Sequence, residues 1–335
     1  MRLVNRSAVL FLGAVVTAGL VACGGDDGGS TGDDIDPTGT DNPYVVSRIQ
    51  LPATANEATQ FGLDIDELAG DAAGGIDNQL GTFLGSLSGI APGLDLSGSL
   101  DEAVDSGSVV LLSNIKATAL DNAAKVGMWV YIGDGDTAMP APCTDATDTV
   151  CRHHLDGTGM FTIEAGSQTD AKMAGNIMAG TFTGGPGNIN LQLSLAADSP
   201  PIDLPLQLAK ASIKVTATGF GAGSKLGGAI AQTDIETKIH PAIKDIVTDL
   251  IDRDCMGTPR TPPNCGCTSG STGLSVLGFL DTATPRDCMV SVAEVTRTLN
   301  DLLQPDIDLD GNGVADAVSL GIGVQAVKGA FTIPQ

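Results

Sequence analysis

Short apolar runs separated by turn residues make up most of the chain, and this spacing constrains the fold more than any other feature. Seven runs with β-branched enrichment or apolar/polar alternation predict strands. Many are joined by short turns containing Gly, Asp or Asn, which is typical of antiparallel meanders rather than βαβ units. We therefore expect a β-rich α+β fold whose antiparallel sheets form a sandwich or a cradle. The predicted strands cover 45–51, 108–120, 126–133, 160–166, 176–183, 188–196 and 204–220.

Fewer segments show the apolar period of a helix. The apolar spacing predicts one helix over 79–88. Capping sequences predict three more, beginning near Ser99, Thr233 and Ser291. Pro305 ends the last of these helices just before an acidic loop. We expect these few helices to lie at the periphery of the sheets.

The N-terminus has the pattern of a secretory signal. Two arginines in MRLVNR precede a short apolar run that ends at Ala22, and this run is too short for a comfortable membrane span. The sequence Leu20-Val21-Ala22-Cys23 resembles the lipobox of bacterial lipoproteins. The resemblance implies a signal peptide over 1–22 and acyl chains, such as palmitate, on Cys23. An ordinary signal with an incidental cysteine is the alternative.

The residue that follows the lipobox also bears on localisation. Gly24 and Gly25 come after the cysteine, so the acidic residue that retains some lipoproteins in the inner membrane is absent. By this resemblance we expect a lipid-anchored protein at the outer membrane or the cell surface, in contact with the membrane through its lipid.

Composition divides the remaining chain and excludes some partners. Residues 23–43 are rich in Gly and Asp and predict a disordered acidic linker, which leaves a single β-rich extracytoplasmic domain over 44–335. The chain has 17 basic and 40 acidic residues, a net charge of −23. This sign repels nucleic acid, so we expect no nucleic-acid partner. Aromatic residues are only 3% of the chain, which argues against stacking platforms for sugars or bases.

The cysteines beyond the lipobox are even in number, which in an exported chain favours disulfides. We expect Cys143 and Cys151 to close a short loop between two strands, and the other four to pair among themselves. A zinc site is the weaker alternative, because Cys265-Gly266-Cys267 lacks the two-residue spacing of a zinc knuckle. The expected disulfide cysteines are Cys143, Cys151, Cys255, Cys265, Cys267 and Cys288.

The stretch DIDLDGNGVAD, residues 306–316, alternates oxygen-bearing side chains with glycines. With Asp308 at position one, it offers oxygens at positions one, three, five, seven and nine and a glycine at position six, as calcium requires of an EF-hand-type loop. The pattern resembles the DxDGxGxxD loops of thrombospondin type 3 and dockerin-like repeats, which implies calcium binding. The predicted ligands in the loop 306–319 are Asp306, Asp308, Asp310, Asn312, Val314 and Asp316.

The loop departs from an EF-hand at position twelve. Ser319 stands where an EF-hand has a bidentate Glu, so we expect a weak site, with a dissociation constant of about 10⁻⁵ to 10⁻³ M. Asp306 could supply the missing ligand. The alternative is a solvated turn that holds no ion.

A fainter version of this pattern lies near the start of the domain. It lacks the Asp-Gly step and carries an insertion, so it is the weaker metal candidate. Its alternative role is an acidic N-cap for the helix that follows. The candidate ligands are Asp64, Asp66, Asp71 and Asp77.

The sequence shows no signature of an enzyme. It lacks HExxH, GxSxG and Walker-type motifs, and we predict no catalytic residue. His153 and His154 are adjacent on a predicted extended segment, where they would point to opposite faces and share no ion. For His240 we expect a structural role.

We therefore expect a non-catalytic, membrane-anchored lipoprotein with a calcium-stabilised binding or structural role, although an enzyme stays possible. One alternative is a carrier of an apolar small molecule or lipid, which would need a large aliphatic cavity. Another is a secreted hydrolase with an unrecognised site, and a protein partner is also open.

Overall fold

The computed structural model of the protein describes residues 35–67, 75–90, 95–145, 147–195 and 200–334. The predicted signal peptide, Cys23, most of the predicted linker and Asp71 lie outside these ranges. The first strand begins at Thr40, already within the segment predicted as linker.

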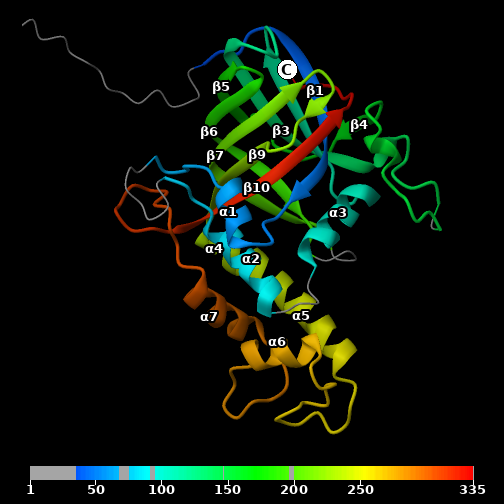
Figure 1. Ribbon diagram of the computed structural model, residues 1–335, viewed down its shortest axis with the longest axis vertical. Coiled ribbons are helices and arrows are strands. Elements are labelled where there is room, and N and C mark those ends of the chain that lie inside the picture. Colours follow the sequence, from blue (N-terminus) through cyan, green and yellow to red (C-terminus); the bar gives the residue numbers. More distant parts are fainter. Residues whose placement is uncertain (1–34, 68–74, 91–94, 146, 196–199, 335) are drawn as a thin grey trace, which may run out of the picture. The chain divides into compact units, whose positions relative to one another are not determined.

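Ten strands form one antiparallel sheet, which confirms the predicted β-rich α+β class (Figure 1). The sheet closes on itself, because β1 pairs with β2 on one side and with β10 on the other. The ring runs β1-β2-β3-β5-β6-β7-β9-β10 and back to β1. A single closed layer is nearer to the expected cradle than to a sandwich. The strands are β1 (Thr40–Gln50), β2 (Leu111–Ala117), β3 (Ala123–Met139), β4 (Met160–Ile163), β5 (Lys172–Met178), β6 (Thr181–Leu193), β7 (Ile202–Thr216), β8 (Gly219–Phe220), β9 (Lys225–Ala231) and β10 (Ala317–Lys328).

Two details of the sheet differ from the sequence prediction. The run 176–183 was expected as one strand, but Ala179 and Gly180 both have positive φ and turn the chain between β5 and β6. Strands β9 and β10 lie outside the seven predicted runs, and in β9 the residues Gly227 and Gly228 weaken the strand signal. Neighbouring backbone explains both glycines: a Cβ on Gly227 would lie 2.6 Å from the Leu320 carbonyl oxygen.

The helices flank the sheet as expected, with some different boundaries. The capping box of Ser291 and Glu294 is present. The cap expected at Ser99 is wrong, because Asp95 caps that helix and Ser99 lies inside it. The helix expected from Thr233 begins at Gln232 and passes through a π-helical turn. The helical segments are α1 (Ala55–Phe61), α2 (Gln79–Ile90), α3 (Leu96–Ser106), η2 (His153–Leu155), α4 (Gln232–Asp234), η3 (Ile235–Ile239), α5 (His240–Asp254), α6 (Thr272–Leu280) and α7 (Val292–Leu302).

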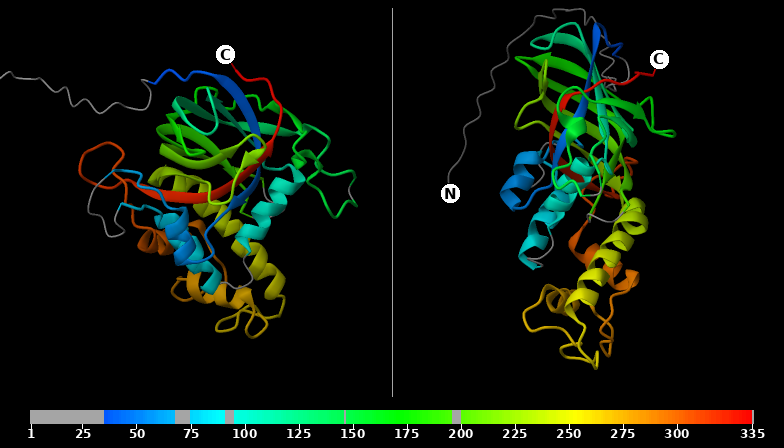
Figure 2. Two further views of the ribbon diagram at one scale, coloured as in Figure 1. Left: turned by 45° about the horizontal axis from the view of Figure 1, so that its top comes forward. Right: turned by 90° about the vertical axis from the view of Figure 1, so that its right-hand side faces the viewer.

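Helices α5, α6 and α7 pack against one another and gather at one end of the closed sheet (Figures 1 and 2). Helix α2 packs on β10. Helix α1 also contacts β10, and its end comes close at Gly321, where a Cβ would lie 2.6 Å from the Phe61 carbonyl oxygen. Large apolar side chains such as Leu112, Met128 and Phe182 are almost fully buried in the main core.

Three disulfides join the six cysteines of the folded part. Cys143 pairs with Cys151, as expected for the short loop. The remaining bonds, Cys255–Cys267 and Cys265–Cys288, lie in the segment that includes α6. Multiple disulfides suggest export, because they persist in oxidising compartments. Among the helices in the described part of the chain, none is long and apolar enough to cross a membrane.

Candidate functional site

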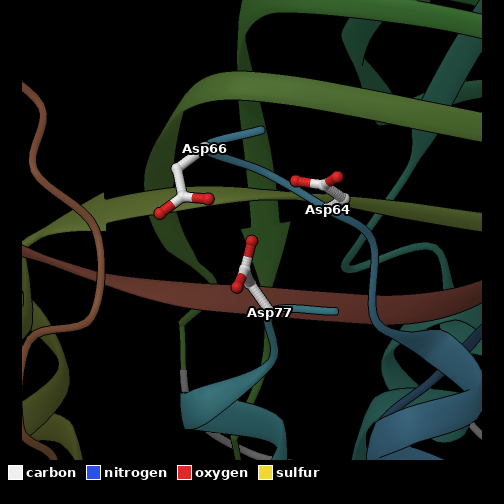
Figure 3. A group of neighbouring side chains, drawn as sticks. All are labelled: Asp64, Asp66 and Asp77. Atoms are coloured by element: carbon white, nitrogen blue, oxygen red, sulfur yellow. The ribbon is translucent and has the colours of Figure 1, made fainter. Parts of the chain in front are cut away.

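Three aspartates from the first acidic segment come together beside the sheet. Ligand oxygens of Asp64, Asp66 and Asp77 all lie within 4.8 Å of one another (Figure 3). Asp64 is exposed, Asp66 is half-buried and Asp77 is buried. Figure 3 shows the carboxylate of Asp77 directed between the other two. The acidic side chains of this segment can therefore hold a metal ion.

Local backbone bonds position these carboxylates. A bridge between Leu63 and Asp77 closes the segment, and the Ile65 N–H donates to Asp77 Oδ2 at 2.6 Å. Asp64 Oδ1 accepts from the Glu67 N–H. Ile65 lies between Asp64 and Asp66 in the sequence. Its side chain is buried, which anchors both aspartates at the protein surface.

The second acidic segment lies against the first. Ile65 packs in one small apolar cluster with Ile307 and Ala317. The carboxylate of Asp306 is close enough to Asp66 for their charges to interact unfavourably. Burial, with a smaller contribution from Asp66, raises the pKa of Asp306. Two acidic segments that are far apart in the sequence therefore meet at one place in the fold.

Ser319 links this acidic site to helix α2. Its hydroxyl donates to Asp306 and accepts from the Gln79 N–H at 2.8 Å. The next residue before the helix, Asn78, accepts from Gly81 N–H and from Gly321 N–H. Ser319 was expected only as the residue that replaces a calcium ligand, and the structure makes it a connector between β10 and α2.

One cation lies near the cluster. The ammonium group of Lys210 donates to the Asp64 carbonyl oxygen at 2.7 Å and to Glu67 at 2.8 Å. The Lys210 ion pair lowers the pKa of Glu67. The lysine therefore engages a neighbouring carboxylate and the backbone of Asp64.

The C-terminal loop is folded around Asp308. This carboxylate accepts backbone N–H groups from Gly311, Asn312 and Gly313. The Gly313 bond in particular holds the pKa of Asp308 below its usual range. Asp310 and Asn312 likewise accept backbone N–H groups two residues ahead.

The carboxylates of this loop do not form a comparable close group of three. Within the ranges that the structure describes, Asp64, Asp66 and Asp77 form the one group of three acidic, His or Cys side chains whose ligand atoms approach this closely. Asp316 is instead bonded to the Leu309 N–H at 2.9 Å. The sequence favoured the C-terminal loop, whereas the structure brings together the carboxylates of the fainter one.

The donor set fits calcium better than a transition metal. The cluster offers only carboxylate oxygens, which are hard ligands of the kind that Ca²⁺ binds. His and Cys ligands, which suit Zn²⁺ and Cu²⁺, are absent from the cluster. Asp64, Asp66 and Asp77 would hold the ion.

The three histidines lie away from this cluster. His153 and His154 belong to η2 rather than to a strand. His153 is bonded to Asp148 at 3.0 Å, whereas His154 is buried against Phe161. His240 is buried, and its Nδ1 lies 3.1 Å from Thr296 Oγ1 on α7.

A cavity of about 60 Å³ lies between the end of the sheet and the helices. Its lining is entirely aliphatic or phenylalanine side chains, with no polar residue. They come from strand ends and from several helices, and include Leu80, Phe83, Ile243, Leu250 and Phe279.

The chain matches no protein-family model. No curated protein and no solved structure is significantly similar to it.

Proposed function

We propose that this protein is an exported, lipid-anchored binding or structural protein that is not an enzyme and is stabilised by calcium. The observation that carries the proposal is the meeting of the segments 64–77 and 306–319. A cation between Asp66 and Asp306 would relieve their repulsion and join the two segments. The all-oxygen donor set supports calcium as that cation.

Calcium titration of the full chain tests this proposal. Because calcium would bind the folded state alone, the melting temperature should rise with its concentration. At about one hundred times the dissociation constant the gain is about 2.7 kcal/mol, or roughly 4 to 5 °C for a domain of about 290 residues. Differential scanning calorimetry measures this rise, with magnesium as the comparison ion.

Matched variants identify the site. Asp64→Asn with Asp66→Asn removes two carboxylates of the cluster, and Asp308→Asn with Asp310→Asn removes two from the C-terminal loop. Asp245→Asn with Asp249→Asn removes the same charge from exposed positions of α5. We expect the first pair to abolish the calcium response and the α5 pair to keep it. An equal response in all variants would mean that calcium only screens charge.

Anchoring and localisation rest on the lipobox resemblance. Several acyl chains on Cys23 would hold the protein stably at a membrane, at about 0.8 kcal/mol for each buried CH₂. The disulfides support export. Gly24 and Gly25 favour the outer membrane or the cell surface.

Cys23→Ser tests the anchor. We expect the wild-type protein to sediment with membranes and the variant to appear in the soluble fraction after cell lysis. Retention of Cys23→Ser in the membrane fraction would contradict lipid anchoring at this cysteine. Mass spectrometry of the N-terminal peptide gives an independent measurement of the acyl mass.

A second candidate function, carriage of an apolar ligand, is favoured by one observation, the apolar cavity. The cavity is smaller than the roughly 150 Å³ that accommodates benzene. A complete lipid therefore does not fit inside the protein in this conformation, and this limit supports the first candidate.

A further inference from the structure

The lining of the cavity restricts what can occupy it. All of its residues are Leu, Ile, Val or Phe, contributed by helices α2, α3, α5, α6 and α7 and by strand ends. A peptide, a sugar or a lipid headgroup would leave its polar groups without hydrogen-bond partners there, which is unfavourable. A hydrocarbon has no such groups, so the chemistry of the lining selects a hydrocarbon.

The size of the cavity restricts the shape of that hydrocarbon. Its volume is about 60 Å³, and a water molecule in the liquid takes about 30 Å³. The terminal carbons of one slender chain fit this space, whereas a ring system or a branched chain does not. The remainder of such a chain would have to lie outside the cavity.

The structure offers a place for that remainder. Leu84, Leu96, Ile243 and Phe279 line the cavity but are only partly buried, so its boundary includes side chains that solvent touches. They belong to four different helices, α2, α3, α5 and α6. Nearby, Leu250 packs in a small cluster separate from the main core. Apolar side chains therefore extend from the cavity to the surface.

We infer that this cavity binds the terminal part of a single unbranched hydrocarbon chain, whose remainder lies against the partly exposed apolar side chains and whose polar end lies in solvent. This inference rests on the second candidate function and is independent of calcium.

Octan-1-ol is the probe, added to the purified full chain in the presence of a calcium chelator. Methyl NMR should show saturable shifts of the Leu80, Ile243 and Val276 resonances, while Ile177 in the distant β5 strand is unchanged. The melting temperature should rise with octan-1-ol concentration. Adamantan-1-ol, which is apolar but bulky, should produce neither effect.

Two substitutions with the same change of side chain complete the test. Val276→Phe fills the cavity from α6, and Val292→Phe adds the same bulk at a partly exposed position of α7. We expect at least a tenfold loss of octan-1-ol affinity in the first variant and none in the second. If Val276→Phe does not fold, the comparison of the two alcohols on the wild-type protein still decides.

Three results would overturn the inference: no saturable shift, equal shifts with adamantan-1-ol, or equal affinity in wild type and a folded Val276→Phe. Mass spectrometry of apolar extracts from the purified protein tests carriage separately. If octan-1-ol binds but no lipid copurifies, the hydrocarbon-binding site is supported and the carrier function is contradicted.

Discussion

Short polar side chains fix the junction between the first helices and strand β10. Asn78 donates to the carbonyl oxygens of Ala58 and Gly321 and accepts two N–H groups in return. The Asn78 side chain is buried, and its amide makes two hydrogen bonds as donor and two as acceptor. Replacing it by an apolar residue would remove the side-chain acceptor of the Gly81 N–H in α2 and of the Gly321 N–H in β10. The acidic cluster lies directly before this residue in the sequence, so the same junction holds Asp77 in place.

A buried histidine makes stability depend on pH. Burial, aided by the charge of Arg152, lowers the pKa of His154 to about 4, while an unfolded histidine titrates near 6.5. Between these values the unfolded chain binds more protons than the folded one. The contribution of His154 is therefore complete above pH 6.5 and is lost as the pH falls towards 4. The loss is at most about 3 kcal/mol.

Urea unfolding at pH 7.5 and at pH 4.5 measures this effect, with His154→Gln as the comparison. His240 is also buried with a lowered pKa, so the wild-type profile contains both histidines. The difference between wild type and His154→Gln isolates His154. We expect the variant to lose less of its free energy of unfolding on acidification, and parallel profiles would contradict the assignment.

At the residue scale the sequence supplied the candidates but not their arrangement. The alternating carboxylates of both acidic segments are visible from spacing alone. The contact between the two acidic segments is not visible in the sequence. It depends on closure of the sheet by β1 and β10, which come from the two ends of the chain. The bonds from backbone N–H groups to Asp308, Asp310 and Asp316 were equally hidden, since they follow from how the loop folds.

Among the elements, the strands followed from sequence where apolar alternation was regular. The apolar alternation is interrupted where local backbone geometry breaks the two-residue period. In β7, Leu208 has a φ of 50° at a register shift, so Leu206 and Ala209 both point to the core although they are three residues apart. Helices α1 and α6 were not predicted, because a short helix and a nearly all-apolar one show little periodicity.

The two groups of disulfides should differ in their effect on stability. Cys265–Cys288 closes 23 residues and both cysteines are buried, whereas Cys143–Cys151 closes 8 residues and is partly exposed. The chain-entropy relation gives about 3.4 kcal/mol for the longer loop and about 2.5 kcal/mol for the shorter. Two polar serines in the core add to the cost of replacing the longer one.

Calorimetry of two double variants tests this order. Cys265→Ser with Cys288→Ser should melt at a lower temperature than Cys143→Ser with Cys151→Ser, which serves as the matched control. Equal melting temperatures, or the reverse order, would mean that the segment around α6 contributes little to the stability of the protein.

For the whole molecule, closure of the sheet is the property on which most else depends. Tyr44 on β1 pairs with Lys328 on β10, so the two ends of the described domain form one seam. Burial raises the pKa of Tyr44 to about 12, and its hydroxyl donates to the Thr216 carbonyl oxygen on β7. The seam therefore connects the start, the middle and the end of the chain. Pairing over such separations carries a large loop-closure cost, so we expect it to form late in folding.

Removal of β10 tests how far the fold depends on closure. A chain that ends at Asp316 leaves β1 and β9 without their shared partner and removes core side chains such as Leu320 and Ile322. We expect it to lose cooperative thermal unfolding, because neither strand edge is then satisfied. A chain that ends at Gly329 keeps β10 whole and is the control, with a small decrease in melting temperature from the lost contact between Phe331 and Tyr131. If the chain that ends at Asp316 still unfolds in one sharp transition, the remaining strands form a stable open sheet. Folding then needs neither the closed ring nor the contact between the acidic segments 64–77 and 306–319.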